Sequence, residues 1–319
     1  MSTRRHPRIG IALGSGSARG WAHIGVLQAL EEQGIRPSVV AGTSVGSLVG
    51  ASFACGKLDE LGEWARKLSW QQVVGFLDSS FNGGLIAGNK LFDFFGSHTE
   101  TRNIEQLPIP FGAVATDLDT GQEVWLQKGS LLRAVRASVA LPGLFTPVQQ
   151  EHQWLLDGGM VNPVPVSLCR ALGAELVIAV DLDANLLQKH ALVADRFTTP
   201  ARDPEPLNPG NDLSNFSDLR EFLHHQVLQL KSNLFADDEI DTPSLIDVIF
   251  RSVNIMQTRI TRSRMAGDPP ELIIAPRLAH IMLMEFHRAG EAIDEGRKAV
   301  ARATNDIQHL RGVLGLEGG

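Results

Sequence analysis

Short apolar runs alternate with longer segments of helical periodicity through the first part of the chain. The run 8–13 predicts a buried strand, and the apolar positions of 21–34 recur at helical spacing. A second strand at 37–43 leads into a second helical segment, which ends at Gly56. Two strand–helix units in immediate succession favour a parallel sheet, because parallel strands are joined by helical crossovers.

Further along the chain the pattern predicts shorter strands and more scattered helices. Strands are predicted at 110–115, 123–127, 154–156, 176–180 and 272–275. Helices are predicted at 58–68, 130–139, 164–172, from 242 onward and at 281–308, the last as one long terminal helix. The helix that begins at 242 is expected to carry its apolar residues on one face. That face consists of Ile246, Ile249, Val253, Met256 and Ile260.

A change in composition divides the chain. Between 195 and 218 the residues are mainly Pro, Asn, Asp and Ser, which is typical of a linker or a mobile lid. We therefore predict a core at 1–185, a variable linker or lid region at 186–241, and a helical segment at 242–319. The last segment is expected to pack on the core and to complete the same domain.

Composition and charge exclude several classes of function. Hydrophobic residues make up 43% and charged residues 20% of the 319 residues, as in ordinary globular proteins. The net charge of −7 provides no electrostatic surface for nucleic acid, so no nucleic acid partner is expected. No apolar run reaches the roughly 18 residues of a membrane span, and the two cysteines favour reduced thiols. We expect a cytoplasmic protein that touches membranes at most peripherally, and a homo-oligomer is compatible with the sequence.

The turn after the second strand contains a G-x-S-x-G pentapeptide. Gly42, Ser44 and Gly46 lie between this strand and a helix of small residues. In such a turn the serine has a strained backbone, and its hydroxyl is presented at a helix N-terminus. Ser44 is therefore a candidate nucleophile. A capping serine in a glycine-rich connection is an equally good interpretation of the pentapeptide alone.

A glycine-rich loop, Gly14–Gly20, follows the first strand in the same way. Cradling a phosphate, forming an oxyanion hole and simply turning tightly are its three possible functions. The G-x-x-x-x-G-K-[ST] signature is absent, and Arg19 stands where a G-x-G-x-x-G motif would have its last glycine. Backbone N–H groups can instead stabilise a developing oxyanion during acyl transfer. The candidate donors are the N–H groups of Ser15, Gly16, Ser17 and Val45.

Other acidic and hydroxyl residues also require a choice between two interpretations. Asp157 ends a short strand and precedes Gly158 and Gly159, so a catalytic role and a simple turn are equally good interpretations. Asp117, in a hairpin turn, fits a turn better than a metal site. Ser138 lacks glycines around it and is interpreted as a helix end. No metal and no cofactor are predicted.

Three of these segments together resemble the signature blocks of the patatin-like phospholipases, in the same order. The blocks are Gly14–Gly20, Gly42–Gly46 and Asp157–Gly159. The segments 137–148 and 162–181 also look like bacterial members, and 251–278 looks like the C-terminal part of a bacterial cytoplasmic subgroup. The resemblance covers most of the chain except the region from about 186 to 241.

The resemblance implies an α/β fold and a Ser/Asp dyad. The expected fold is a three-layer α/β/α sandwich with a mainly parallel central sheet, related to the catalytic domain of cytosolic phospholipase A2, plus C-terminal helices. Ser44 would be the nucleophile, Asp157 its partner, and Arg19 would orient the loop or meet a phosphate head group. Family members commonly have glycine where this chain has Ser15 and Ser17, but the serine N–H groups can still donate.

The resulting prediction is a serine acyl hydrolase that acts on a lipid or another acyl ester. One alternative is an α/β-hydrolase with a Ser/Asp/His triad. Its histidine would be one of His190, His224, His225, His280 and His287. The other alternative is a non-catalytic regulatory or scaffolding protein that keeps the same fold.

Overall fold

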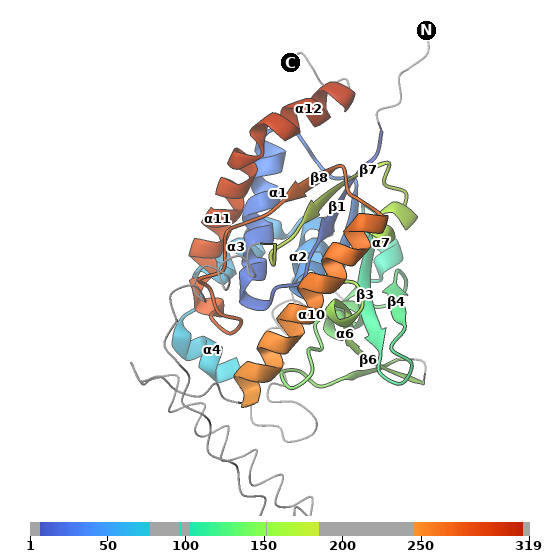
Figure 1. The fold of residues 1–319 in the computed structure, drawn as a ribbon, viewed down its shortest axis with the longest axis vertical. Helices are drawn as coiled ribbons and strands as arrows, with labels where there is room; N and C mark the ends of the chain where they lie inside the picture. Colours follow the sequence, from blue (N-terminus) through green and yellow to red (C-terminus); the bar gives the residue numbers. More distant parts are fainter. Residues whose placement is uncertain (1–6, 77–95, 97–101, 151, 185–244, 315–319) are drawn as a thin grey trace, which may run out of the picture.

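The computed structural model describes residues 7–76, 96, 102–150, 152–184 and 245–314, so the predicted linker at 186–241 lies outside the described residues (Figure 1). The described strands are β1 (Ile9–Leu13), β2 (Val39–Thr43), β3 (Phe111–Asp117), β4 (Glu123–Leu126), β5 (Val148–Gln150), β6 (Gln153–Asp157), β7 (Leu176–Val180) and β8 (Leu272–Ile274). They form one eight-stranded sheet in the order β5-β6-β3-β2-β1-β7-β8, with β4 paired to β3.

The sheet is parallel in its centre and antiparallel at one end. Strands β3, β2, β1, β7 and β8 run parallel, and β4, β5 and β6 form the antiparallel part. Every residue of β1 and β2 is buried, as expected for central parallel strands that read as continuous apolar runs. The short strand β5 is not predicted, because two of its three residues are glutamines.

Helices cover both faces of the sheet. The described helices before β7 are η1 (Ser17–Trp21), α1 (Ala22–Glu32), α2 (Val45–Ala54), α3 (Leu58–Arg66), α4 (Trp70–Phe76), η2 (Ile104–Gln106), α6 (Leu131–Ser138), η3 (Gly158–Met160) and α7 (Val166–Ala171). Those after β7 are α10 (Leu245–Gly267), η4 (Phe286–Arg288), α11 (Ala289–Arg302) and α12 (Thr304–Leu314). Ile11 and Leu13 of β1 pack in one cluster with α1, α2 and α6, whereas Ala12 packs in another cluster with α7. The predicted α/β sandwich with a mainly parallel sheet is therefore confirmed.

The C-terminal part of the chain joins this core directly. Strand β8 pairs with β7, and α11 (red in Figure 1) runs beside α1 (blue). Each of these two helices has a glycine where the other approaches. A Cβ atom at Gly25 would lie 1.9 Å from the Ile293 carbonyl oxygen, and one at Gly296 would lie 2.1 Å from that of Ala22. The backbones of α1 and α11 therefore approach each other more closely than a side chain at either glycine would allow.

The predicted single helix at 281–308 is wrong. Residues 275–285 form an irregular loop, and α11 and α12 are separated at Ala303. The predicted helix would begin in this loop, where Ile281 is 3% exposed but Met282 is 70% exposed, and Leu278 is fully buried earlier in the same loop. Apolar periodicity alone cannot distinguish a side chain that is buried on a helix from one that is buried in a loop.

The apolar face of α10 is only partly buried. Val253 is buried, but Ile249 and Met256 are 44% and 45% exposed. The buried side carries the polar residues Gln257 and Thr258 instead, because α10 packs beside the loops at the carboxyl ends of the strands. None of the described helices combines the length and the apolar character needed to cross a bilayer.

Candidate active site

The register of three strands brings Ser44 and Asp157 together. Strand β2 pairs with one edge of β3 up to the pair Thr43–Val114, and β6 pairs with β3 from Ala115 onward, with Asp157 opposite Ala115. Strand β4 pairs both with residues of β3 that pair with β2 and with residues of β3 that pair with β6. It therefore lies on the opposite edge of β3, and β2 and β6 follow one another along the same edge. Because β2 and β6 run in opposite directions, their carboxyl ends meet there, and Ser44 follows directly.

The turn at Ser44 has the geometry of a nucleophile elbow. Its φ of 56° and ψ of −130° are rare for a residue with a side chain. Gly42 and Gly46 allow close approach, since a Cβ atom at Gly46 would lie 2.2 Å from the Leu13 carbonyl oxygen. The backbone N–H of Ser44 donates to Ser138 Oγ at 3.0 Å. Ser138 is thus a buried support of the elbow.

Asp157 is held in a defined orientation toward Ser44. Ser44 Oγ donates to Asp157 Oδ2 at 2.6 Å, and the Gly159 N–H donates to Asp157 Oδ1 at 2.7 Å. The carboxyl group is 1% exposed, and this burial raises its pKa from 3.8 to about 6, against the opposing effect of the two hydrogen bonds. Gly158 lies against the Val114 carbonyl oxygen, where a Cβ atom would be 2.2 Å away. At pH 7 the carboxylate is mostly ionised and can accept a proton.

Three backbone N–H groups around Ser44 are free to bind an oxyanion. They belong to Gly16 and Ser17 in the glycine-rich loop and to Val45 at the start of α2. None of the three donates to an acceptor within the described part of the chain. All three residues line the same pocket as Ser44. The arrangement has the elements of an oxyanion hole.

The backbone N–H of Ser15, expected above among these donors, is not free. It donates to the Pro163 carbonyl oxygen at 2.9 Å, because the loop packs against the segment between η3 and α7. The Ser15 hydroxyl donates to Gln257 Oε1 of α10 at 3.2 Å. Ser15 therefore anchors the loop, and Gly16 and Ser17 provide its available donors.

Arg19 lies beneath the glycine-rich loop and does not line the pocket. Its side chain is 2% exposed, and its Nη1 lies 3.2 Å from Asp183 Oδ1 in a buried ion pair. Arg19 Nε donates to the Gly16 carbonyl oxygen at 3.2 Å, and Nη2 donates to Asn254 Oδ1 at 3.4 Å. Of the two roles expected for Arg19, this geometry favours orientation of the loop over contact with a head group.

No histidine among the described residues lines the pocket. His23 lies behind the loop, with Nε2 2.7 Å from the Gly14 carbonyl oxygen, and burial lowers its pKa to about 4. A neutral ring that donates to this carbonyl stabilises the loop. His280 pairs with Glu291 at the surface. His190, His224 and His225 lie outside the described residues.

A pocket of about 50 Å³ opens beside Ser44 and Asp157. Its walls are mainly apolar and come from both ends of the chain. They include Trp21, Leu48, Leu141, Phe145, Phe250 and Phe286. An apolar pocket with a few converging polar groups is typical of a site for a small organic ligand. Its composition suits a hydrocarbon chain whose polar end reaches Ser44.

The hairpin aspartate has the turn role predicted for it. Asp117 Oδ1 accepts hydrogen bonds from the N–H groups of Asp119 and Thr120, at 3.0 and 2.8 Å. The bonds from Thr120 hold the pKa of Asp117 below its usual value. Within the described ranges, no three His, Cys, Asp or Glu side chains gather in a way that could hold a metal ion.

The sequence indicated the loop, the elbow and the aspartate, but not the residues that hold them in place. Gln257, Leu283 and Asp183 come from segments without a motif. Leu283 contributes only its backbone carbonyl, for which a sequence has no signal. A signal existed for Gln257, because Asn254, Gln257 and Thr261 recur at helical spacing and form a polar side of α10, on which Gln257 and Thr261 are buried.

Comparison with known proteins gives relatives for most of the chain. The family model "Patatin-like phospholipase" matches residues 11–170. An NTE family protein of Mycobacterium tuberculosis is 34% identical over 93% of this chain and 91% of its own length. Patatin-like phospholipase domain-containing protein 6 of Homo sapiens is 35% identical, but over 54% of this chain and only 13% of its own. VipD from Legionella pneumophila shares the fold, with a TM-score of 0.53 and 10% identity, over 93% of this chain and 66% of VipD.

Proposed function

The chain belongs to the patatin-like phospholipase family, and from this premise we propose that it is a serine acyl hydrolase that cleaves a lipid or another acyl ester. Ser44 is the nucleophile and Asp157 is the general base. The observation that carries the proposal is the 2.6 Å hydrogen bond from Ser44 Oγ to Asp157 Oδ2, at the edge of an apolar pocket. This pair supports a Ser/Asp dyad.

The first step is acylation of the serine. Asp157 Oδ2 accepts the hydroxyl proton while Ser44 Oγ forms a bond to the carbonyl carbon of the ester. The carbonyl oxygen becomes negatively charged, and the N–H groups of Gly16, Ser17 and Val45 stabilise it. When the tetrahedral intermediate breaks down, the bond to the leaving alcohol oxygen is cleaved, and Asp157 returns the proton to that oxygen.

The second step releases the acyl group to water. Asp157 accepts a proton from the attacking water molecule, the acyl–Oγ bond breaks, and the proton returns to Ser44. A general base works best when its pKa lies near the working pH, and burial brings the pKa of Asp157 to about 6. An alkoxide leaving group requires less protonation than an amine. A carboxylate base without histidine therefore suits esters.

The experiment compares wild type and Ser44→Ala on a panel of acyl esters and lipid extracts. We expect Ser44→Ala to lose activity by roughly 10⁴-fold or more, since the covalent route depends on this oxygen. Ser52→Ala is the matched control, because Ser52 is a buried serine of α2 whose hydroxyl donates to the Leu48 carbonyl oxygen at 3.0 Å. Full esterase activity in Ser44→Ala would contradict the proposal.

Two further measurements separate the proposal from its alternatives. A serine-reactive phosphonate should form an adduct at Ser44 that mass spectrometry detects. A folded protein with no adduct and no ester cleavage would support a scaffolding protein instead. Replacing the five late histidines one at a time by alanine should leave acyl transfer intact, and loss of the reaction at one of them would support a triad.

A further inference from the structure

Two side chains of the glycine-rich loop are bound by the C-terminal part of the chain. We infer that Ser15 and Ser17 are positioning residues, which fix the loop to Gln257 and Leu283 and thereby hold the oxyanion donors in place. The inference rests on the proposed function and deepens it. Both partners lie beyond residues 11–170, the stretch that the family model matches.

The contact with Leu283 lies on one side of the free donors. Ser17 Oγ donates to the Leu283 carbonyl oxygen at 2.7 Å, and the Ala18 N–H donates to the same oxygen at 3.1 Å. A carbonyl oxygen has two lone pairs, so this acceptor is fully used. One residue of the loop between β8 and η4 thus binds two consecutive residues of the glycine-rich loop.

The contact with Gln257 lies on the other side. Ser15 Oγ donates to Gln257 Oε1 at 3.2 Å, and the Gln257 side chain is 5% exposed. The other end of the same amide contacts the turn after Asp157, since a Cβ atom at Gly159 would lie 2.4 Å from Gln257 Nε2. Gln257 therefore lies between the loop that donates to the oxyanion and the turn that carries the base.

The backbone between these two contacts needs such support. Gly16 has a φ of 156° and Ser17 a φ of 51°, both outside the regions that residues with side chains usually adopt. Strained conformations persist only when their surroundings enforce them. The free N–H groups of Gly16 and Ser17 lie within this strained stretch. Fixing them before substrate binds is what makes oxyanion donors effective.

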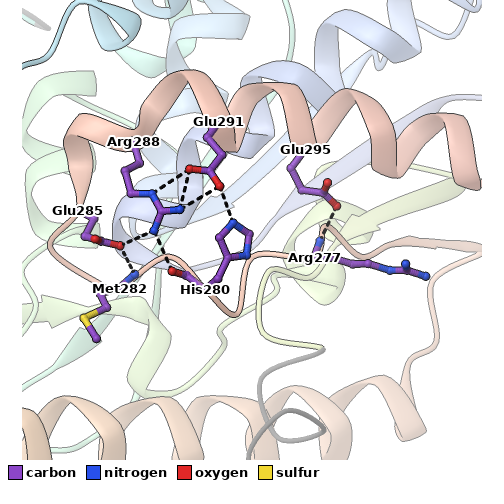
Figure 2. A network of polar contacts seen from close by, with 7 residues as sticks. All are labelled: Arg277, His280, Met282, Glu285, Arg288, Glu291 and Glu295. Atoms are coloured by element: carbon purple, nitrogen blue, oxygen red, sulfur yellow. Dashed lines mark hydrogen bonds and ion pairs between the residues drawn. The ribbon is translucent and has the colours of Figure 1, made fainter. Parts of the chain in front are cut away.

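The segment that carries Leu283 is itself fixed on both sides (Figure 2). Glu285 accepts a hydrogen bond from the Met282 N–H at 2.8 Å and pairs with Arg288 at 3.0 Å. Arg288 also donates to the His280 carbonyl oxygen at 2.8 Å. The position of the Leu283 carbonyl oxygen is therefore fixed by its neighbours, and the Ser17 hydroxyl binds the glycine-rich loop to it. Glycine at this position would lack that hydroxyl.

The first test is Ser17→Gly. Glycine tolerates the positive φ, so the change removes the hydroxyl without adding backbone strain. We expect kcat to fall about tenfold while KM changes less than about twofold, and the hydrogen-bonded amides of Ala18 and Arg19 to exchange hydrogen faster. Ser38→Ala is the matched control, because the Ser38 hydroxyl also donates to a distant carbonyl, that of Ile9 at 3.2 Å, at the opposite end of the sheet. Unchanged kcat and unchanged exchange in Ser17→Gly would overturn the inference.

The second test is a double-mutant cycle of Ser15→Gly and Gln257→Met, with Thr258→Val as the control on the same helix. If Gln257 acts through Ser15, the double variant should lose no more kcat than the more affected single variant. Losses that multiply would show that the two residues act separately and would overturn this half of the inference. If wild type cleaves no ester, the proposed function fails, whereas hydrogen exchange of the loop still decides the inference.

Discussion

The two halves of the proposed active site are held in place by different means. The Ser44–Asp157 pair is positioned by the register of β2, β3 and β6, all within the part of the chain that the family model matches. The hydroxyls of the glycine-rich loop donate hydrogen bonds to α10 and to the loop after β8, outside that part. Many backbone hydrogen bonds hold the strands of a sheet in register, whereas only a few hydrogen bonds hold a strained loop in its conformation.

The same contrast appears in the two strained serines. Ser44 has a φ of 56°, and its N–H is bound by Ser138, which is 94 residues away in the sequence. Ser17 has a φ of 51°, and its hydroxyl is bound by Leu283, which is 266 residues away. We therefore expect changes in the dyad to abolish the reaction, and changes in the supports of the loop to weaken it by degrees.

The largest effect is expected for Asp157→Asn, which removes the base and leaves the strand register intact. We expect kcat to fall by about 10⁴-fold, because the amide accepts no proton from Ser44. The variant should be at least as stable as wild type at pH 7, because it removes a buried charge. Urea unfolding and ester hydrolysis measure the two effects. An active Asp157→Asn protein would contradict the assignment of the base.

An intermediate effect is expected for Arg19→Met, on the loop side of the comparison. The variant leaves Asp183 buried without its partner, which should lower the free energy of unfolding by about 3 kcal/mol. It also removes the bond from Arg19 Nε to the Gly16 carbonyl oxygen, so kcat should fall by more than in Ser17→Gly. Adding Asp183→Asn should restore part of the stability but not kcat. An Arg19→Met protein with wild-type stability and kcat would show that the loop needs no ion pair.

The smallest effect is expected from a change of pH close to the midpoint of the profile, and the profile separates the contribution of Asp157 from that of the glycine-rich loop. Asp157 must be ionised to accept a proton, so kcat/KM should fall about tenfold per pH unit below about 6 and stay level above it. Ser17→Gly should lower the whole profile without moving its midpoint, because the hydroxyl does not titrate. A shifted midpoint in this variant would mean that the loop also acts on the base.

The contribution of Asp157 to the stability of the protein should follow the opposite trend across the same pH range. The pKa of Asp157 is higher in the folded protein, about 6, than its ordinary value of 3.8, so protonation favours the folded state. This contribution is fully present below about pH 3.8 and is lost as the pH rises through about 6. The ionised form of Asp157 that the proposed reaction requires is therefore the form that stabilises the folded protein less.

The sequence allows most of the fold to be predicted, and less of the site. The strands β1, β2, β3 and β7 follow from apolar runs, and the family follows from three glycine-containing blocks in order. The loop before α11 was not predicted, because an apolar residue such as Ile281 can be buried in a loop as well as on a helix. Ser15 was expected to donate its N–H, and only the contact with Pro163 shows that this group is occupied.

The sequence by itself determined the chemistry that each segment can offer: a hydroxyl on a G-x-S-x-G turn at Ser44, a carboxylate before two glycines at Asp157, and backbone N–H groups in the glycine-rich loop. Only the tertiary structure decided which of these groups meet. Ser44 and Asp157 are 113 residues apart, and they meet because β2 and β6 share one edge of β3. Apolar patterns fix which side of a strand is buried, but the pairing of strands and the partner of a loop hydroxyl depend on the packing of the whole chain.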